Sequence, residues 1–222
     1  GREYYFFTNN SSKSQQDYIE KLERFGIRIK RQQMMTSTHV ISRYLKQHYE
    51  GKSIYVLGTP SLIQEFQYFD MNLTEENPDI VVLGFDTTLT YEKLSKACHY
   101  IRNGCIYFGI NPDWNCPMEG GTFIPDCGSM AKLIEASTGR FPEFFGKPSK
   151  HTLDYIIQET GYEPDEIAIV GDRLYTDIAV ADQSDVTSIL VLSGESTRED
   201  VKTSDVKPNV ILEDLSEITK ML

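Results

Sequence analysis

Two polar clusters in the sequence contain residue types suited to binding a phosphate group and a divalent cation. In the first, residues 167–179 read IAIVGDRLYTDIA, so an apolar run ends in Gly171 and Asp172, and Asp177 follows five residues later. A carboxylate at the carboxyl end of a strand can present oxygen to a hard cation such as Mg²⁺, which binds few protein carboxylates and keeps several waters. Asp177 either joins that site or complements a helix dipole, and Asp172 has an equally common structural role as a capping residue.

The second cluster lies in the sequence FFGKPSKHTLDYII at residues 144–157. Here Lys147 occupies a Gly-Lys-Pro turn just before a helix whose first turn follows Ser149. A lysine held beside a helix N-terminus forms a small cationic pocket that suits phosphate. Because surface lysines are common, this cluster carries weight only in combination with the others.

A third polar group follows the first apolar run, EYYFFT at residues 3–8. Residues 4–7 are four consecutive aromatics, which predicts a buried strand with Thr8 at its carboxyl end and Asn9 and Asn10 directly after it. Ligands of open α/β sheets bind at the carboxyl ends of the strands. The simpler alternative is that Thr8, Asn9 and Asn10 only form a turn. Together, however, the three clusters would supply hydroxyl, amide, ammonium and carboxylate groups to one crevice.

These groups require a framework of alternating strands and helices. Apolar, β-rich runs recur at residues 3–8, 53–58, 80–86, 105–110, 166–172 and 188–194, and amphipathic helical patterns occur at 40–49, 91–103, 128–138, 149–160 and 175–181. Strands that alternate with helices predict βαβ units and mainly parallel sheets. After the first strand, Ser14 and Asp17 have the spacing of a capping box, and the helical pattern that follows stops at Gly26.

The composition narrows the classes of function. Of the 222 residues, 33 are acidic and 22 basic, which gives a formal net charge of −11 without a basic block, so neither nucleic acid nor an anionic membrane is an expected partner. An acidic protein that binds a phosphorylated small molecule needs local positive charge, and a divalent cation is the obvious source. The four cysteines and four histidines lack zinc-site spacing. With no signal peptide or long apolar run, the sequence predicts a cytoplasmic protein with reduced thiols.

In order and spacing, these motifs resemble those of the haloacid dehalogenase (HAD) superfamily, and within it the NagD-like branch, subfamily IIA, which includes p-nitrophenyl phosphatases. The stretch FFTNNSSKS resembles the second motif of the family, GKPS the third and VGDRLYTDI the fourth. The stretches PDCGSMAKLIEASTGR (125–140) and ILVLSGES (189–196) are also similar to this branch.

The resemblance implies a Rossmann-like parallel-sheet core with an inserted α/β cap of the C2 type. Residues 1–48 and 142–222 would form the core, and residues 49–141 the cap. The implied activity is Mg²⁺-dependent hydrolysis of small phosphomonoesters, such as a sugar phosphate or a nucleotide, through an aspartyl-phosphate intermediate. A small phosphorylated metabolite is the implied ligand, and a homodimer formed through the cap is a further expectation.

The same resemblance assigns roles to individual residues. Thr8 and Asn9 would bind the transferring phosphoryl group, with Asn10 as their neighbour in the loop. Lys147 would neutralise the phosphoryl oxygens and the nucleophile. Asp172 would be a direct Mg²⁺ ligand, and Asp177 would support the metal site.

The first motif of the family, Asp-x-Asp-Gly, supplies the nucleophile and does not occur in these residues. It would precede the first strand by one βαβ unit, on the order of 30 residues. We therefore expect the chain to be a fragment that lacks the central strand and does not turn over by itself. The alternative is a non-catalytic, HAD-like protein that binds a phosphorylated metabolite. A dinucleotide-binding module is disfavoured because no strand is followed by G-x-G-x-x-G.

The sequence from 111 to 128, NPDWNCPMEGGTFIPDCG, is long for a connection, and long structured loops are often functional. Trp114, Asn115 and Cys116 are candidates for contacts with the leaving group of the substrate. The structural alternatives are that Trp114 packs in the core of the cap, that Cys116 is an ordinary small thiol, and that Glu119–Gly121 form a hairpin turn between two edge strands.

Overall fold

The structure is a computed structural model that describes residues 2–220 and consists of two units, residues 1–146 and 147–222. In the first unit the strands are β1 (Phe6–Thr8), β2 (Met34–Thr36), β3 (Ile54–Leu57), β4 (Ile80–Leu83), β5 (Ile106–Gly109), β6 (Asn115–Pro117), β7 (Phe123–Pro125) and β8 (Glu143–Phe144), and the helices are α1 (Gln15–Arg24), α2 (Ser37–His48), α3 (Pro60–Tyr68), α4 (Tyr91–Arg102) and α5 (Cys127–Thr138). The second unit contains α6 (Lys150–Thr160), β9 (Ala168–Gly171), β10 (Thr187–Val191), α7 (Arg198–Thr203) and β11 (Val210–Leu212).

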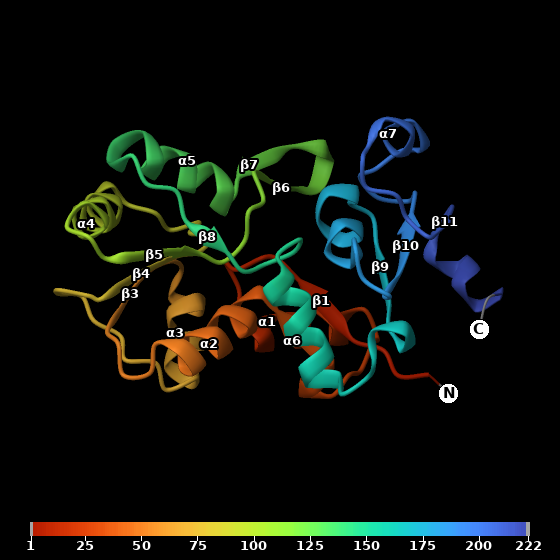
Figure 1. The fold of residues 1–222 in the computed structure, drawn as a ribbon, viewed down its shortest axis with the longest axis horizontal. Helices are drawn as coiled ribbons and strands as arrows, with labels where there is room; N and C mark the ends of the chain where they lie inside the picture. The colour runs from red at the N-terminus through yellow and green to blue at the C-terminus, as the bar shows by residue number, and fades with distance from the viewer. Residues whose placement is uncertain (1, 221–222) are drawn as a thin grey trace. The chain divides into compact units, whose positions relative to one another are not determined.

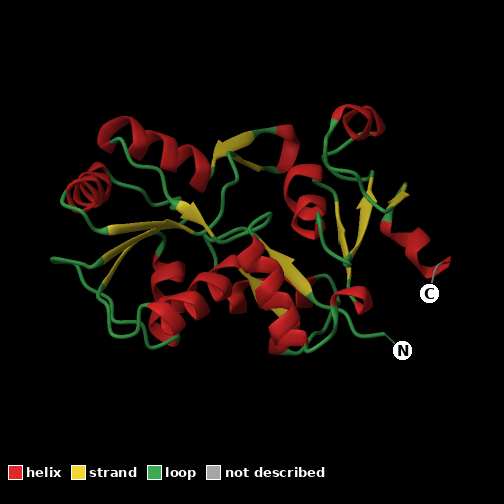
Figure 2. Cartoon of the chain, viewed as in Figure 1, coloured by secondary structure: helices red, strands yellow, loops and turns green. Residues whose placement is uncertain are grey.

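A four-stranded parallel sheet in the order β3-β4-β5-β8 organises much of the first unit. Helices α4 and α5 cover one face of this sheet, and α2 and α3 lie on the other (Figure 1). Strands β3 and β4 are buried at every position, as expected for a parallel sheet covered on both faces. Figure 2 shows the same alternation of strands and helices by colour.

One hydrophobic core lies between this sheet and the helices α4 and α5. Alternate residues of β3 and β4, such as Leu57 and Leu83, point into it and pack with Ile101 and Ile134 from the helices. Burial of each such side chain stabilises the fold by about 1.5–3 kcal/mol. On the opposite face, the ring of Tyr44 in α2 lies 6.0 Å from that of Phe108 in β5. The sheet is therefore held between two helical layers.

Strands β1 and β2 form a separate two-stranded parallel pair in the first unit. The expected capping box ahead of α1 is confirmed, because Ser14 Oγ accepts a hydrogen bond from Asp17 N at 3.2 Å and Asp17 accepts one from Ser14 N at 2.8 Å. The expectation of a buried strand over residues 4–7 is only partly correct. The strand begins at Phe6, and Tyr4 is 53% exposed. The partner strand β2 begins at Met34, opposite Phe6, and within residues 2–220 no other strand pairs with β1.

The second unit contains a three-stranded parallel sheet in the order β11-β10-β9. A single π-helical turn (Leu174–Ile178) follows β9 and continues into a 3₁₀ turn (Ala179–Ala181), where the sequence predicted a regular helix. Leu174 and Ile178 from this turn pack with Leu190 of β10 in a small core.

Most predicted strands and helices occur close to their predicted bounds, and the hairpin turn at residues 119–121 joins the antiparallel strands β6 and β7. The pattern of the sequence did not reveal β2, α3, β8, α7 or β11. The predicted division into a core and a cap spanning 49–141 stays a prediction. Among residues 2–220, no helix has the length and hydropathy needed to cross a bilayer.

Candidate active site

Thr8, Asn9 and Asn10 form a turn at the carboxyl end of β1. Asn10 N donates to Thr8 Oγ1 at 3.2 Å, and Asn10 Oδ1 accepts from Ser12 N at 3.0 Å. Thr8 also interacts with the hydroxyl of Tyr18, whose burial raises its pKa to about 12, so this group stays a neutral phenol. The turn-forming role that the sequence left open is therefore present, and it holds the hydroxyl and backbone amides at the strand end.

A buried polar network connects this turn to the long loop after β5. Asn9 Nδ2 donates to Asp113 Oδ2 at 2.9 Å, and Ser11 Oγ donates to Asn111 Oδ1 at 2.7 Å. Ser11, Asn111 and Asp113 are all buried. Although Asn9 and Asp113 are 104 residues apart in the sequence, the fold brings them into direct contact.

The three candidates for contacts with a leaving group lie in and beside β6. Trp114 is 48% exposed, so the alternative that it packs in the core of the cap is wrong. Asn115 is also exposed, whereas Cys116 is half-buried and its Sγ lies 3.9 Å from Asn10 Nδ2. Cys116 thus contacts the Thr8–Asn10 turn.

In the second unit, Lys147 and Asp177 form a close ion pair. Lys147 Nζ lies 2.6 Å from Asp177 Oδ1, and both side chains are only 12% exposed. Lys147 precedes α6, where Ser149 is the N-cap residue as predicted. Burial opposes ionisation of Asp177, but the charge of Lys147 and hydrogen bonds from Lys147 and from the backbone N–H groups of Arg173 and Asp172 outweigh it, so the pKa of this carboxyl lies below 3.8.

Asp177 also holds the end of β9 in place. Its Oδ2 accepts hydrogen bonds from Asp172 N at 3.2 Å and Arg173 N at 3.1 Å. The wide turn from Leu174 to Ile178 places this carboxylate against Gly171, where any Cβ would lie 2.2 Å from Asp177 Cβ. Both carboxylate oxygens of Asp177 are therefore already bonded within the protein, which fits a supporting role better than direct metal ligation.

Asp172 is positioned by the loop that follows β10. Its Oδ2 accepts a hydrogen bond from Glu195 N at 2.9 Å, and its backbone carbonyl accepts one from Ser196 N at 3.0 Å. A Cβ at residue 194 would lie 2.2 Å from Asp172 Oδ2, so only glycine leaves room for the carboxylate. Glu195 is itself held by Arg173, with Nε 2.7 Å from Oε2.

Asp172 suits a magnesium ion as a single carboxylate ligand. One of its oxygens accepts a hydrogen bond from Glu195 N, and the other forms none within residues 2–220. Magnesium binds through one or two carboxylates and keeps several waters. The described part of the chain contains no group of three or more His, Cys, Asp or Glu side chains that could hold a metal ion. Within residues 2–220, Asp172 could therefore offer one carboxylate to a cation but not a complete set of protein ligands.

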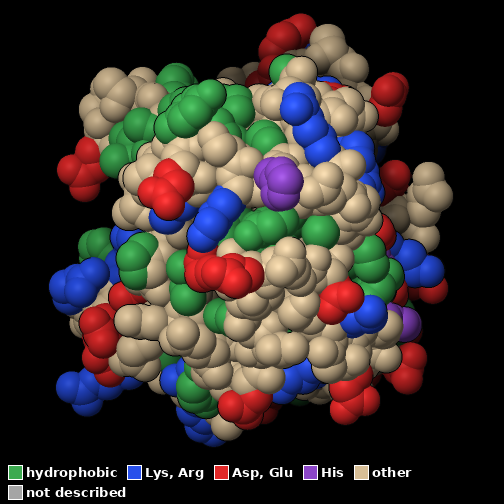
Figure 3. Space-filling model, turned by 90° about the vertical axis from the view of Figure 1, so that its left-hand side faces the viewer, with side chains coloured by type: hydrophobic (Ala, Val, Ile, Leu, Met, Phe, Trp, Pro, Cys, Tyr) green, Lys and Arg blue, Asp and Glu red, His purple; other side chains and the backbone are tan. Residues whose placement is uncertain are grey.

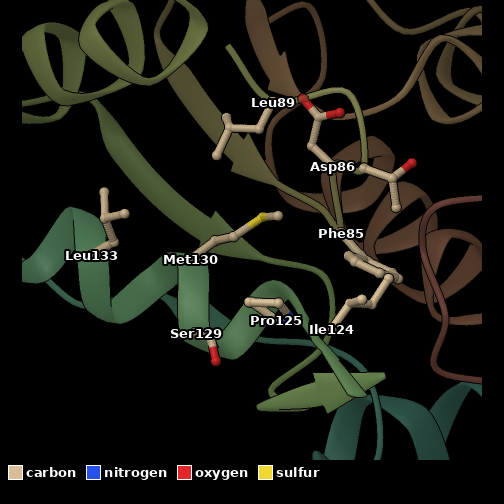
Figure 4. Close-up of a pocket in the computed structure, with 9 residues that line it drawn as sticks. Phe85, Asp86, Leu89, Ile124, Pro125, Ser129, Met130 and Leu133 are labelled. Carbon is tan, nitrogen blue, oxygen red and sulfur yellow. The ribbon is translucent and has the colours of Figure 1, made fainter. Parts of the chain in front are cut away.

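One pocket of the first unit is lined by other residues. Figure 4 shows its apolar walls, and its lining includes Phe85, Asp86, Leu89, Ile124, Met130 and Leu133. Asp86, which is buried, pairs with Lys93 at 2.8 Å. None of the predicted site residues lines this pocket. On the face shown in Figure 3, acidic and basic side chains are interspersed, so this face presents no basic surface to a nucleic acid.

The fold and the polar strand ends define a Rossmann-like α/β protein with functional groups at the carboxyl ends of parallel strands. Residues 1–72 match the model of the haloacid dehalogenase-like hydrolases, and residues 144–218 match that of the HAD-hydrolase-like proteins. The chain belongs to the haloacid dehalogenase-like hydrolases, in their NagD-like branch.

Several relatives are similar over nearly the whole chain. An acid sugar phosphatase from Staphylococcus aureus is 34% identical over 218 residues, which are 98% of this chain and 84% of the relative. The crystal structure of 4-nitrophenylphosphatase from Thermotoga maritima matches with a TM-score of 0.93 and 43% identity, covering 97% of this chain and 83% of that one. NagD from E. coli K-12 matches with a TM-score of 0.87 and 31% identity, covering 96% of this chain and 84% of that one.

The sequence did not identify several residues that hold Asn9 or Asp172 in place. Ser11, Asp126 and Gly194 each lie in a stretch that resembles the family, but no local pattern marked these three residues individually. The Asn-Pro-Asp sequence at residues 111–113 directly after a strand was the one local signal for the network. Nothing in the sequence near Asp172 indicates that residues 194–196 hold it, because that contact spans 22 residues or more.

Proposed function

We propose that the complete protein is a magnesium-dependent phosphatase that hydrolyses small phosphomonoesters, a sugar phosphate or nucleotide among them, through an aspartyl-phosphate intermediate. The observation that carries this proposal is the contact of Lys147, which precedes α6, with Asp177, which follows β9 together with Asp172, in a chain that belongs to a hydrolase family. The names of the relatives, acid sugar phosphatase and 4-nitrophenylphosphatase, support phosphate esters as the substrate class.

In this proposal, each residue has a specific role. Thr8 Oγ1 and the backbone N–H of Asn9 bind the transferring phosphoryl group, and Asn10 shapes their turn. Lys147 neutralises negative charge on the phosphoryl oxygens as it develops, which is the kind of electrostatic stabilisation that dominates phosphoryl transfer. Asp172 holds a divalent cation, whose charge would orient and neutralise the phosphate when bound. Asp177 keeps both Lys147 and the Asp172 backbone in position.

The nucleophile would be an aspartate of an Asp-x-Asp-Gly motif, which these 222 residues do not contain. Within the described residues, β1 has β2 as its only strand partner and β9 has only β10, so each strand has an edge without a partner. Unpaired edges of parallel strands are unfavourable, and a further strand beside β1 or β9 would pair one of them. We propose that the nucleophile lies on such a strand, in a part of the protein outside residues 1–222.

The absence of Asp-x-Asp-Gly favours a second candidate function, a non-catalytic protein that binds a phosphorylated metabolite. Release of inorganic phosphate from a panel of sugar phosphates, nucleotides and p-nitrophenyl phosphate, measured on the full-length protein with Mg²⁺ and with chelator, separates the two. Magnesium-dependent release is the expected result. A folded protein that binds these esters without releasing phosphate would favour the second candidate instead.

A further inference from the structure

Asn9 is held from two directions by buried side chains. Ser37 Oγ, at the start of α2, donates a hydrogen bond to the backbone carbonyl of Asn9 at 2.8 Å. The carboxylate of Asp113 accepts a hydrogen bond from Asn9 Nδ2 at 2.9 Å. Ser37 is fully buried and Asp113 is 3% exposed. Both the backbone carbonyl and the side chain of Asn9 are therefore held in place.

Asp113 is in turn fixed by its own loop. Asn111 Nδ2 donates to Asp113 Oδ2 at 2.9 Å and to Asp126 Oδ1 at 3.0 Å, and Asp126 Oδ1 accepts a further bond from Cys127 N at 2.6 Å. Burial of carboxylates is costly unless hydrogen bonds compensate for the lost hydration. Asp113 and Asp126 thus form a rigid, hydrogen-bonded network rather than a chance pair of buried acids.

The space around Asn9 allows little movement of its side chain. A Cβ added at Gly146 would lie 2.7 Å from Asn9 Oδ1 and 3.0 Å from the carbonyl oxygen of Ile110. The glycine backbone therefore packs directly against the amide of Asn9. With the carbonyl bonded to Ser37 and the amide between Asp113 and Gly146, residue 9 has one well-defined orientation.

We propose that Asp113 is a positioning residue for phosphate binding, acting through Asn9. This inference rests on the proposed function, in which the backbone N–H of Asn9 binds the phosphoryl group. A misplacement of about 1 Å in a group that binds the reacting atoms can cost about 100-fold in rate, so a side chain that sets this position controls turnover without touching the substrate.

The same contact couples the Thr8–Asn10 turn to the candidate leaving-group contacts. Trp114 follows Asp113 directly in the chain, and Cys116 lies 3.9 Å from Asn10 Nδ2. The turn that would bind phosphate and the segment that would face the leaving group are therefore joined by two contacts, Asn9 with Asp113 and Asn10 with Cys116. Substitutions at Asp113 are expected to change kcat as well as the affinity for phosphate.

The test uses the full-length protein and two probes, p-nitrophenyl phosphate for kcat and KM and inorganic phosphate for the inhibition constant. Asp113→Ala should raise the inhibition constant for phosphate and lower kcat, by up to about 100-fold. Asp113→Asn keeps one oxygen that can accept from both Asn9 and Asn111, and it should retain most of the phosphate affinity. The exposed Asp205→Asn serves as the matched control and should behave as wild type.

A double-mutant cycle shows whether Asp113 acts through Asn9. If it does, Asp113→Ala combined with Asn9→Ala should have the same inhibition constant for phosphate as Asn9→Ala alone. Fully additive effects of the two substitutions on the inhibition constant would overturn the proposal. The proposal would also be overturned if Asp113→Ala lowered the melting temperature but left the inhibition constant for phosphate of the folded protein unchanged. A wild-type protein that neither hydrolyses the ester nor binds phosphate would instead contradict the proposed function itself.

Discussion

Lys147 Nζ lies 2.6 Å from Asp177 Oδ1, and this ion pair joins the turn before α6 to the turn after β9. The two residues are 30 positions apart in the chain, and both side chains are 12% exposed. Their contact fixes the ammonium group, and it also neutralises a carboxylate that organises the backbone at Asp172 and Arg173.

Removal of the ammonium group should impair both catalysis and stability. In Lys147→Ala, loss of charge compensation is expected to lower kcat by about 10²–10³-fold, as for other preorganised electrostatic groups. The same change leaves the buried charge of Asp177 without its cation, which costs about 3–5 kcal/mol in the free energy of unfolding. Steady-state kinetics and urea unfolding measure the two effects. Lys150→Ala, an exposed lysine in the next turn, is the control, and Lys147→Arg keeps the charge if the alanine variant unfolds. A kcat near that of wild type would refute the role of Lys147.

Acid unfolding should report the Asp177 ion pair. The pKa of this carboxyl lies below its ordinary value of 3.8, so the unfolded chain takes up a proton at higher pH than the folded one. The stabilisation is therefore complete above pH 3.8 and is lost as the pH falls through the lowered pKa. The free energy of unfolding of the wild type should exceed that of Asp177→Asn at neutral pH, and the difference should narrow only in strong acid. If the difference in the free energy of unfolding between the two proteins stayed constant down to about pH 2, the pKa of Asp177 would not be lowered in the way described.

Asp172→Asn should weaken metal binding and lower turnover. The substitution removes the negative charge that a hard cation prefers, while the amide oxygen can still accept the hydrogen bond from Glu195 N. For this variant, titration calorimetry with MgCl₂ should show a higher Kd for Mg²⁺. The concentration of Mg²⁺ that gives the half-maximal rate of hydrolysis should also rise. Asp182→Asn, an exposed aspartate of the same unit, provides the comparison. An unchanged dependence on metal concentration would exclude Asp172 as a ligand.

Gly194→Ala should displace the Asp172 carboxylate. The new methyl group would lie 2.2–2.5 Å from three side-chain atoms of Asp172, so the aspartate must move. We expect weaker Mg²⁺ binding in calorimetry. Gly161→Ala introduces backbone strain at a positive φ, but its Cβ meets nothing within 4 Å, so it should lower stability by about 1 kcal/mol without affecting metal affinity. Equal metal affinities for the two variants would show that residue 194 does not position Asp172.

His39 should make the protein less stable in mild acid. Burial is the main cause that lowers its pKa from 6.5 to about 4, with smaller contributions from Arg31 and Arg43, although Glu65 lies 3.9 Å away. Between pH 6.5 and about pH 4 the unfolded chain binds a proton that the folded chain does not. The free energy of unfolding should therefore fall by about 1.4 kcal/mol for each unit by which the pH decreases. His39→Gln should flatten this slope in urea titrations between pH 4 and 6.5. A slope identical to that of wild type would assign the acid sensitivity to another group.

Most element types, their order and the strand ends that carry functional groups could be predicted from the amino-acid sequence. Apolar runs of strand length before Asp172 and Thr8, the Gly-Lys-Pro turn and the Ser14–Asp17 capping box depend on residues that are close in the chain. Local propensity and spacing are sufficient for such features. The order and spacing of these local motifs are also sufficient to indicate the family of hydrolases.

Which of these groups meet, and what each one does, depended on the packing of distant segments. Asp177 could have been a metal ligand or a dipole partner, and its bonds to Lys147 and two backbone amides could not be read from spacing. The contact between Asn9 and Asp113 spans 104 residues. Gly194 follows β10 and packs against Asp172, which follows the neighbouring strand β9. Such contacts arise when strands and loops distant in sequence come together in the fold, and no local pattern of residues encodes that packing.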